Sequence, residues 1–245
     1  MSSPRDRYIT VFGRRPVLEV LADAELRVAK VLVADNARGP EIGEIQQLAN
    51  RRNIECRRVD PRDVTRVSRN GRQDQGVVAD VEAPRMRALD DWLESAPAVA
   101  TAVVLDGITN PQNVGMILRA ATGAGVDGVV VPTAGVADIG PLVIKASAGV
   151  AFRAPIIRTR SASVAIEALR SAGFRIYGLD AAGARGLFDH HPFGDRSAFV
   201  LGGEHSGLTV DVDETVSIPM SAGVDSLNVA VAAGVVCFEV VRRRL

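Results

Sequence analysis

The chain has 245 residues, of which 47% are apolar and 24% are charged, and its formal net charge is zero. This composition is typical of a globular protein with one large domain or two modest ones, and no apolar run is long enough to span a bilayer. The first residues hold no apolar stretch of the kind found in secretory signals, and Cys56 and Cys237 are the only cysteines. We therefore expect a cytoplasmic protein without a membrane span, a disulfide framework or a zinc site.

Residues 12–81 alternate between helical and extended patterns. The segment after Phe12 is a turn into a helix, with Pro16 near the first turn, where proline is well tolerated. Apolar runs bounded by polar residues indicate short strands between the helices. This pattern predicts a small α/β unit with helices after Phe12 and over 41–52 and 61–67, and strands over 29–34, 54–59 and 76–81.

Basic residues are concentrated in the same part of the chain. Residues 1–87 carry 17 Lys and Arg against 13 Asp and Glu, whereas residues 88–245 carry 12 against 16. Eight arginines and three acidic residues fall between Arg51 and Arg72. Because arginine forms paired hydrogen bonds with phosphate, this stretch is a candidate for contacts with a nucleic-acid backbone.

A polar segment flanked by prolines, residues 84–97, separates this unit from the rest. Leu89, Trp92 and Leu93 recur in it at helical spacing, so we predict a linker that leads into a short helix. Beyond residue 98, continuous apolar strands alternate with helical stretches, which predicts a parallel sheet covered on both faces. The predicted strands are 102–106, 128–132, 175–180, 198–202 and 214–219.

The first polar cluster follows the strand that ends at Asp106. Asn113 stands near the start of the next helix, where it could act as a cap. Arg119 lies further along that helix among apolar neighbours. Taken alone, Arg119 is either a surface residue whose stem packs on the helix or a functional group.

The second cluster is the glycine-rich turn that begins at Gly202, Gly203 and Glu204. Glycine permits backbone conformations closed to other residues and lets a ligand approach the main chain. A tight turn without a ligand is the alternative interpretation. The three histidines of the chain show no metal-ligand spacing.

The third cluster joins the strand that ends at Pro219 to an apolar helix beginning near Val229. Ser226 or Asp225 could cap that helix. A buried structural helix explains the apolar and small residues that follow. It does not explain Ser226 and Asn228 beside the end of a strand, so these two are functional candidates.

These three clusters, in this order and spacing, resemble the motifs of the SpoU (TrmH-like) family of SPOUT RNA ribose 2'-O-methyltransferases. Residues 13–17 and 75–79 are similar to motifs of the L30e-like substrate-binding domain of many SpoU enzymes. The resemblance implies an α/β protein with an L30e-like RNA-binding domain over 1–84, a linker over 85–99 and a catalytic domain over 100–245. It also implies that the parallel SPOUT sheet of the catalytic domain carries a deep trefoil knot.

The resemblance further implies a site that binds S-adenosylmethionine and needs no metal. Because a guanidinium is normally always protonated, Arg119 suits contact with a phosphate better than general base catalysis. The catalytic candidates are Arg119, Asn113, Glu204, Ser226 and Asn228. The donor-binding candidates are Gly202, Gly203, Ile218, Pro219, Met220 and Leu227. The RNA-binding candidates are Arg14, Arg15, Arg57, Arg58, Arg62 and Arg72.

The implied function is 2'-O-methylation of a ribose in RNA by a homodimer joined through the catalytic domain. The accessory domain favours ribosomal RNA, and 23S rRNA in particular, over tRNA, although a tRNA methyltransferase is an alternative. A non-catalytic RNA-binding protein on the same fold is a second alternative, which predicts the loss of Arg119, Asn113 or Asn228. A nucleotide-dependent oxidoreductase is a third, and it predicts a glycine-rich phosphate loop after the first strand. The residues after Asp106 lack that loop, and all three catalytic candidates are present.

Overall fold

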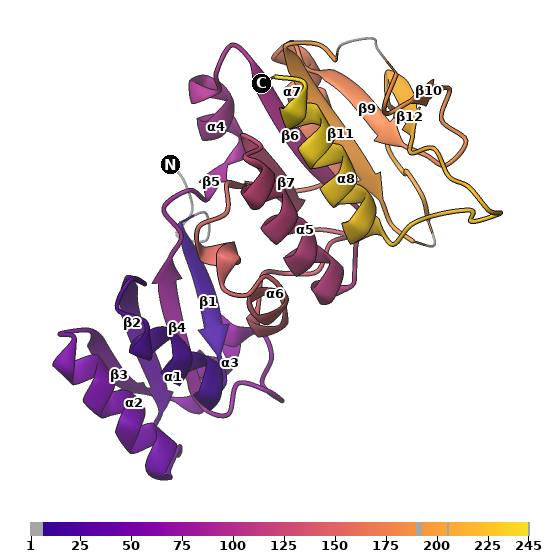
Figure 1. The fold of residues 1–245 in the computed structure, drawn as a ribbon. Coiled ribbons are helices and arrows are strands. Elements are labelled where there is room, and N and C mark those ends of the chain that lie inside the picture. Colours follow the sequence, from indigo (N-terminus) through magenta and orange to yellow (C-terminus); the bar gives the residue numbers. More distant parts are fainter. Residues whose placement is uncertain (1–6, 190–192, 205, 245) are drawn as a thin grey trace. The chain divides into compact units, whose positions relative to one another are not determined.

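The computed structural model describes residues 7–189, 193–204 and 206–244 (Figure 1). The chain divides into two compact units. The N-terminal unit comprises residues 3–84 and 139–141, and the C-terminal unit comprises residues 85–138 and 142–245. No helix in the described part of the chain is long and apolar enough to cross a membrane.

A four-stranded sheet in the order β1-β4-β2-β3 forms the centre of the N-terminal unit. β4 is antiparallel to both of its neighbours, and β2 is parallel to β3. The first strand is not among the predicted ones, because its five residues bury only Ile9 and Val11 and give too short a pattern. The bounds are β1 Tyr8–Phe12, β2 Val28–Ala34, β3 Glu55–Val59 and β4 Val77–Glu82.

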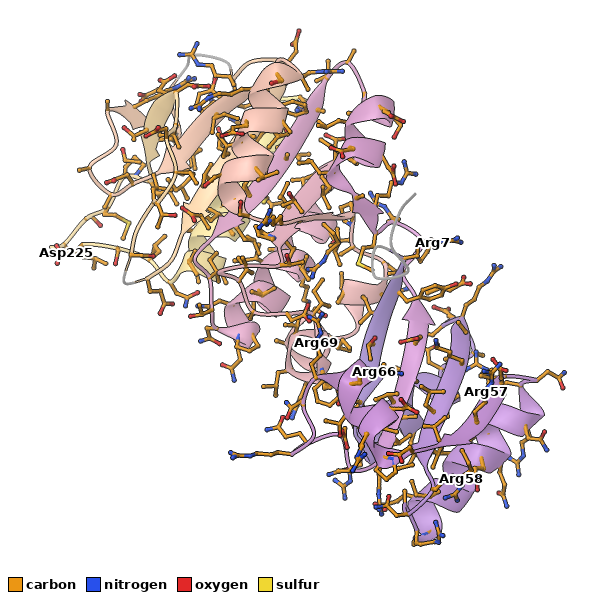
Figure 2. The ribbon with its side chains drawn as sticks, turned by 180° about the vertical axis from the view of Figure 1, so that it is seen from behind. Arg7, Arg57, Arg58, Arg66, Arg69 and Asp225 are labelled. Carbon is orange, nitrogen blue, oxygen red and sulfur yellow. The ribbon has the colours of Figure 1, made fainter. Side chains whose placement is uncertain are left out.

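Three helices cover this sheet, namely α1 Arg14–Ala22, α2 Pro40–Arg51 and α3 Pro61–Ser68. α1 and α2 pack against each other, and α3 lies on the opposite face, which Figure 2 brings to the front. Gly13 and Gly39 precede α1 and α2 with φ angles of 91° and 118°, a region that favours glycine. Neither glycine supplies a side-chain cap, and at the start of α1 the main-chain N–H of Arg14 donates to Gln75 Oε1 at 3.0 Å instead.

The C-terminal unit contains an eight-stranded sheet in which every pair of neighbours is parallel. Its order is β10-β12-β9-β11-β6-β7-β8-β5. Continuous apolar strands predict such a sheet, and β6, β7 and β11 are buried over almost their whole length. The bounds are β5 Arg87–Ala88, β6 Ala100–Asp106, β7 Gly128–Pro132, β8 Ile156–Thr159, β9 Arg175–Leu179, β10 Arg185–Gly186, β11 Arg196–Gly202 and β12 Glu214–Ser217.

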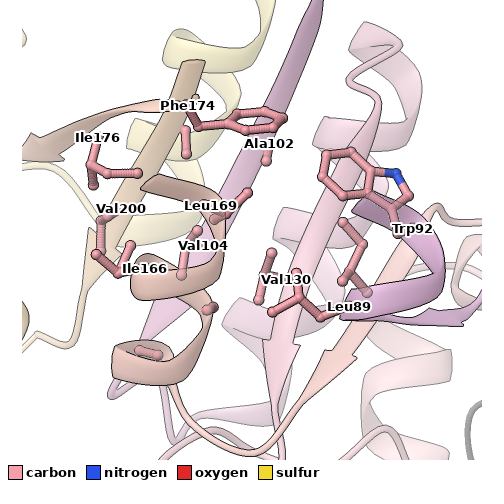
Figure 3. Close-up of a cluster of buried hydrophobic side chains, with 14 of the residues drawn as sticks. Leu89, Trp92, Ala102, Val104, Val130, Ile166, Leu169, Phe174, Ile176 and Val200 are labelled. Carbon is pink, nitrogen blue, oxygen red and sulfur yellow. The ribbon is translucent and has the colours of Figure 1, made fainter. Parts of the chain in front are cut away.

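Helices lie on both faces of this sheet. On one face α5 and α8 pack side by side (Figure 1). On the other face α4 and α7 enclose an apolar cluster in which Trp92 tilts against Phe174 with 5.7 Å between ring centroids (Figure 3). The bounds are α4 Leu89–Ser95, α5 Pro111–Ala124, α6 Pro141–Ala146, a 3-10 turn Val150–Phe152, α7 Ala162–Ser171 and α8 Val229–Arg242.

Several local expectations differ from the structure. The segment 85–99, expected as a linker leading into a short helix, contains β5 and α4, and it buries Leu89 and Trp92. β8 was not predicted, and β12 ends at Ser217 rather than at Pro219. Both predicted caps are wrong, since Asn110 caps α5 and Asn228 caps α8. In each case a side-chain oxygen accepts the N–H group two residues further on, at 2.9 Å.

Candidate active site

The order in which strands are added to the large sheet reverses at β6, although all strands run parallel. β7 and β8 are added on one side of β6, whereas β11, β9 and β12 lie on the other. Ligands of open parallel sheets bind outside the carboxyl ends of the strands at such a reversal. A cavity of about 310 Å³ lies there, lined by the ends of β9, β11 and β12 and by the loop before α8.

Most of the predicted donor-binding residues line this cavity. They are Gly202, Gly203, Ile218, Met220 and Leu227, while Pro219 is exposed and does not line it. Asp180, Leu208 and Ala232 also line it and were not among the candidates. Asp180 is the last residue of a predicted strand, so its position at a strand end is a signal that the sequence does contain. Nothing in the sequence distinguishes the other two.

Three predicted catalytic side chains contact one another at the edge of this cavity. Asn113 Nδ2 donates to Glu204 Oε1 at 2.8 Å. Asn228 Nδ2 donates to the same oxygen at 3.3 Å and to Asn113 Oδ1 at 3.2 Å. The cluster joins residues 91 and 115 positions apart in the sequence. Because Asn113 is only 3% exposed, its amide is held by packing as well as by these bonds.

The cap of α8 fixes which way the Asn228 amide points. Its Oδ1 accepts the Ala230 N–H at 2.9 Å, so its Nδ2 must be the group that faces Glu204. Both amide donors fall on Glu204 Oε1, and Glu204 itself is exposed. The second carboxylate oxygen is therefore available to a ligand.

The turn that carries Glu204 is closed by contacts between main chains. Gly203 and Gly207 form an isolated bridge, with the Gly207 N–H donating to the Gly203 carbonyl at 2.9 Å. A Cβ at Gly202 would lie 2.4 Å from the Gly207 carbonyl carbon, and one at Gly203 would lie 2.5 Å from the Gly107 carbonyl oxygen. These positions therefore require glycine for the close approach of two loops.

The charged residues that line the cavity are all acidic. They are Asp180, Glu204 and Asp225, and within the described residues none of them forms an ion pair. Glu239 of the same unit contrasts with them, since it is bonded to Arg242 and Arg243 and is nearly buried. The hydrogen bond from Arg242, followed by that from Arg243, lowers the pKa of Glu239 to about 2 although burial opposes the shift.

Two catalytic candidates are less closely associated with the cluster. Ser226 lines the cavity but is exposed, as is Asp225 in the same loop (Figure 2). Arg119 is an exposed residue of α5 that does not line the cavity, and no bond joins it to the Asn113–Glu204–Asn228 cluster. On its helix it follows Met116 by three residues, so the two side chains share a face.

The predicted RNA-binding arginines divide into engaged and available groups. Arg58 is engaged, since its guanidinium donates to the carbonyls of Ala34 and Ala37 at 3.1 and 3.0 Å. Arg57, its neighbour on β3 in Figure 2, pairs with Glu55 but is 65% exposed. Exposed arginines with no ion pair among the described residues are Arg15, Arg62 and Arg72.

Arg14, the remaining RNA-binding candidate, lines a second cavity of about 550 Å³ within the N-terminal unit. Its guanidinium pairs with Glu41 at 2.9 Å, and its N–H donates to Gln75 Oε1 at 3.0 Å. Arg38 and Asn36 also line the cavity. Arg14 begins α1 and Glu41 lies in the first turn of α2, so the N-terminal ends of two helices meet at this cavity.

No group of three or more His, Cys, Asp and Glu residues in the described part of the chain is arranged to hold a metal ion. The histidines His190, His191 and His205 lie outside the described residues.

Comparisons with known proteins match both units. Residues 100–238 match the model of the SpoU rRNA Methylase family, and residues 10–87 match the model for RNA 2'-O ribose methyltransferase substrate binding. The chain is 37% identical over 241 residues to the 23S rRNA (guanosine-2'-O-)-methyltransferase RlmB of Xylella fastidiosa (strain 9a5c), with 96% of each chain covered. It is 36% identical over 225 residues to the protein of that name from Xanthomonas campestris pv. campestris, covering 89% of this chain and 90% of the relative.

Among solved structures, the chain is similar to the SpoU methyltransferase AviRb from Streptomyces viridochromogenes in complex with the cofactor AdoMet. The TM-score is 0.66 at 28% identity, over 98% of this chain and 91% of that one.

Proposed function

The chain belongs to the SpoU rRNA methylase family, and we propose that it methylates the 2'-hydroxyl of a ribose in 23S rRNA. Its reaction class is that of an RNA 2'-O-methyltransferase with S-adenosylmethionine as methyl donor. The choice of 23S rRNA rests on the relatives that carry that substrate in their names and align over nearly the whole chain. We propose residues 1–84 as the RNA-binding domain and residues 100–245 as the methyltransferase domain, joined by 85–99.

The observation that carries the proposal for the site is the cluster of Asn113, Glu204 and Asn228 beside the acidic cavity. The two amides hold one oxygen of Glu204, so its other oxygen can accept a hydrogen bond from the ribose 2'-hydroxyl. Orienting the hydroxyl in this way aligns its lone pair for an in-line displacement. As the new O–C bond forms, the hydroxyl proton passes to this oxygen of Glu204. Ser226 lies in the loop opposite and is a second polar contact for the nucleotide.

The cavity fits the methyl donor in size, shape and charge. Its volume falls at the low end of the range for small-molecule sites. Gly202 and Gly203 allow ligand contact with the main chain, and Ile218, Met220 and Leu227 supply apolar surface. When bound, S-adenosylmethionine supplies a methyl group on a positively charged sulfur, and the electron pair of the broken C–S bond stays on sulfur. The three carboxylates that line the cavity form no ion pair among the described residues, and they favour such a cationic ligand.

The RNA side of the proposal rests on arginines. We propose that the cavity lined by Arg14 and Arg38 contacts the RNA backbone, because two helix N-termini there add to the attraction for phosphate. Arg15, Arg62 and Arg72 extend this charged surface. Arg38 and Arg58 both donate to main-chain carbonyls, but only Arg38 lines the cavity, so we assign Arg58 a structural role. Arg57 is a weaker candidate than Arg14.

A homodimer explains the isolation of Arg119. Met116, Val231 and Phe238 on α5 and α8 are 41%, 52% and 57% exposed, an apolar face of the kind that a second copy covers. We propose that dimerisation through α5 and α8 brings Arg119 to the active site of the partner subunit, where it binds a phosphate of the target nucleotide. The trefoil knot and a cytoplasmic location, where rRNA is found, are parts of the same proposal.

Methyl transfer to separate RNA pools tests the function. The purified protein is incubated with radiolabelled S-adenosylmethionine and unmodified large-subunit rRNA, small-subunit rRNA or tRNA. We expect label in large-subunit rRNA alone, recovered after alkaline hydrolysis as a 2'-O-methyl dinucleotide. Label in tRNA would replace the rRNA proposal. Absence of label from every pool while donor binding persists would favour the non-catalytic alternative.

Complementation tests the dimer. Arg119→Ala and Glu204→Gln are each expected to keep only a small, measurable fraction of wild-type turnover alone. If each site takes Arg119 from the partner, mixed dimers contain one site with both residues intact and recover up to about a quarter of the activity. No recovery after mixing, with exchange of subunits verified, would contradict the shared site.

A further inference from the structure

Asp106 is a buried carboxylate that the site described above does not use. It is the last residue of β6, is 4% exposed and lies opposite Gly202 of β11. Its Oδ2 accepts the Thr209 N–H at 2.6 Å and its Oδ1 accepts the Thr209 hydroxyl at 2.7 Å. Both oxygens thus accept hydrogen bonds from one residue, 103 positions away in the sequence. No ion pair to Asp106 occurs among the described residues.

This pair of bonds joins the two segments that carry the catalytic cluster. Asp106 leads into the loop before α5, which bears Asn113. Thr209 ends the turn that bears Glu204 and is closed by the bridge between Gly203 and Gly207. The distance between Glu204 and Asn113 therefore depends on how firmly the two segments are held together.

We propose that Asp106 and Thr209 are positioning residues for methyl transfer, which set the place of Glu204 against Asn113 and Asn228. The inference rests on the proposed role of Glu204. It explains why a carboxylate is buried without a cation, which is costly unless its hydrogen bonds are complete. Two short bonds to one residue fix both the distance and the direction of the turn, which a single bond would not do.

The alternative is that the hydrogen-bonded pair of Asp106 and Thr209 only stabilises the fold. A stabilising pair and a positioning pair differ in how their loss affects turnover. Small displacements of a reacting group reduce the rate steeply while leaving ligand affinity almost unchanged. Loss of a pair that only stabilises the fold lowers the free energy of unfolding without a selective effect on turnover.

Thr209→Val tests the inference, because it removes the hydroxyl and keeps the shape of an exposed side chain and the main-chain bond. We expect kcat to fall about tenfold while the dissociation constant for S-adenosylhomocysteine, measured by calorimetry, changes less than about threefold. Thr209→Ser keeps both bonds and should restore kcat. The matched control is Ser171→Ala on α7, which removes one exposed hydroxyl bond, to the Glu167 carbonyl at 2.9 Å, elsewhere in the same unit.

A double-mutant cycle with Glu204→Gln identifies the residue through which Thr209 acts. If Thr209 works through Glu204, Thr209→Val should lower kcat less than about twofold in the Glu204→Gln background. An undiminished tenfold loss there, or equal losses in Thr209→Val and Ser171→Ala, would overturn the inference. If Glu204→Gln itself retains full activity, the proposed function of the site fails instead, so the two failures are distinguishable.

Discussion

The cavity of the N-terminal unit and that of the C-terminal unit differ most in the charges that line them. Two arginines, Arg14 and Arg38, and one carboxylate, Glu41, line the first, together with the N-terminal ends of two helices. Asp180, Glu204 and Asp225 line the second, with no lysine or arginine among its lining residues. The chain as a whole carries no net charge. The neutral total therefore combines two regions of opposite charge, one suited to an anionic polymer and one to a cationic methyl donor.

Among the described residues, no lysine or arginine lines the donor cavity, so the cavity itself offers no cation for the phosphate of the target nucleotide. Arg119 is the proposed exception, and its removal should have the largest effect. We expect Arg119→Ala to lower turnover about a thousandfold, as the loss of a group that stabilises or aligns charge at the reacting centre does. Binding of S-adenosylhomocysteine, measured by calorimetry, should stay within about threefold, because Arg119 does not line the donor cavity. Undiminished turnover would remove Arg119 from the mechanism.

The donor cavity depends on backbone contact rather than on charge alone. In Gly202→Ala the new Cβ would lie 2.4 Å from the Gly207 carbonyl carbon, so the turn must shift. We expect affinity for S-adenosylhomocysteine to fall about a hundredfold by calorimetry, since a displaced turn disturbs many contacts at once. Gly123→Ala is the matched control, because it lies in α5, has no positive φ and meets no atom within 4 Å. Equal affinities in the two variants would show that the turn does not shape the cavity.

The cavity of the N-terminal unit should respond to salt. We expect the double substitution Arg14→Gln and Arg38→Gln to weaken RNA binding about tenfold and to reduce the slope of log affinity against log salt by about 1.5. Donor binding should not change. Fluorescence anisotropy with a labelled large-subunit rRNA fragment at several salt concentrations measures both quantities.

Arg57→Gln is the comparison variant for that experiment. Arg57 is exposed and lies in the arginine-rich stretch of the sequence, but it does not line the cavity. We expect a change in affinity of less than about twofold. A loss as large as that of the double variant would assign RNA binding to the arginine-rich stretch as a whole.

The parallel sheet of the C-terminal unit was predictable because its strands are continuous apolar runs. β6, β7, β9, β11 and β12 were all predicted, and their fold class is confirmed by the similarity to AviRb. β8 was missed because its two buried residues, Ile156 and Ile157, are followed at once by the half-buried Arg158 and Thr159, so its place is decided by pairing with β7 rather than by its own pattern. The two helix caps were misassigned because several neighbouring polar residues have similar capping preferences.

The candidate site was predictable only in part. The motifs identified Asn113, Glu204 and Asn228, but nothing local to them predicts that one carboxylate oxygen receives both amides. Thr209 lies in no motif, and its pairing with Asp106 depends on how β6 and β11 align. In the N-terminal unit, counting arginines could not separate Arg58, which is bonded to carbonyl groups, from available ones such as Arg62. The bonds that decide these roles join residues far apart in the sequence.

The smallest expected effect concerns the acidic residues outside the donor cavity. Glu239 differs from Glu204 in having two arginine partners, and its pKa is lowered to about 2 chiefly by the hydrogen bond from Arg242. Because the folded-state pKa lies below the ordinary value of 4.5, the stabilisation is fully present above pH 4.5 and is lost as the pH falls towards 2. We expect Glu239→Gln to lower the free energy of unfolding by about 1–3 kcal/mol at neutral pH. Denaturant unfolding of wild type and variant between pH 7 and pH 3 should show this difference shrinking below about pH 4.5.

The control for this experiment is Glu167→Gln, an exposed change on α7 without an ion pair in the described chain, which should show almost no difference at any pH. A pH-independent difference for Glu239→Gln would mean that Glu239 stabilises α8 by packing, and the contrast between paired and unpaired carboxylates in this unit would then lose its electrostatic basis.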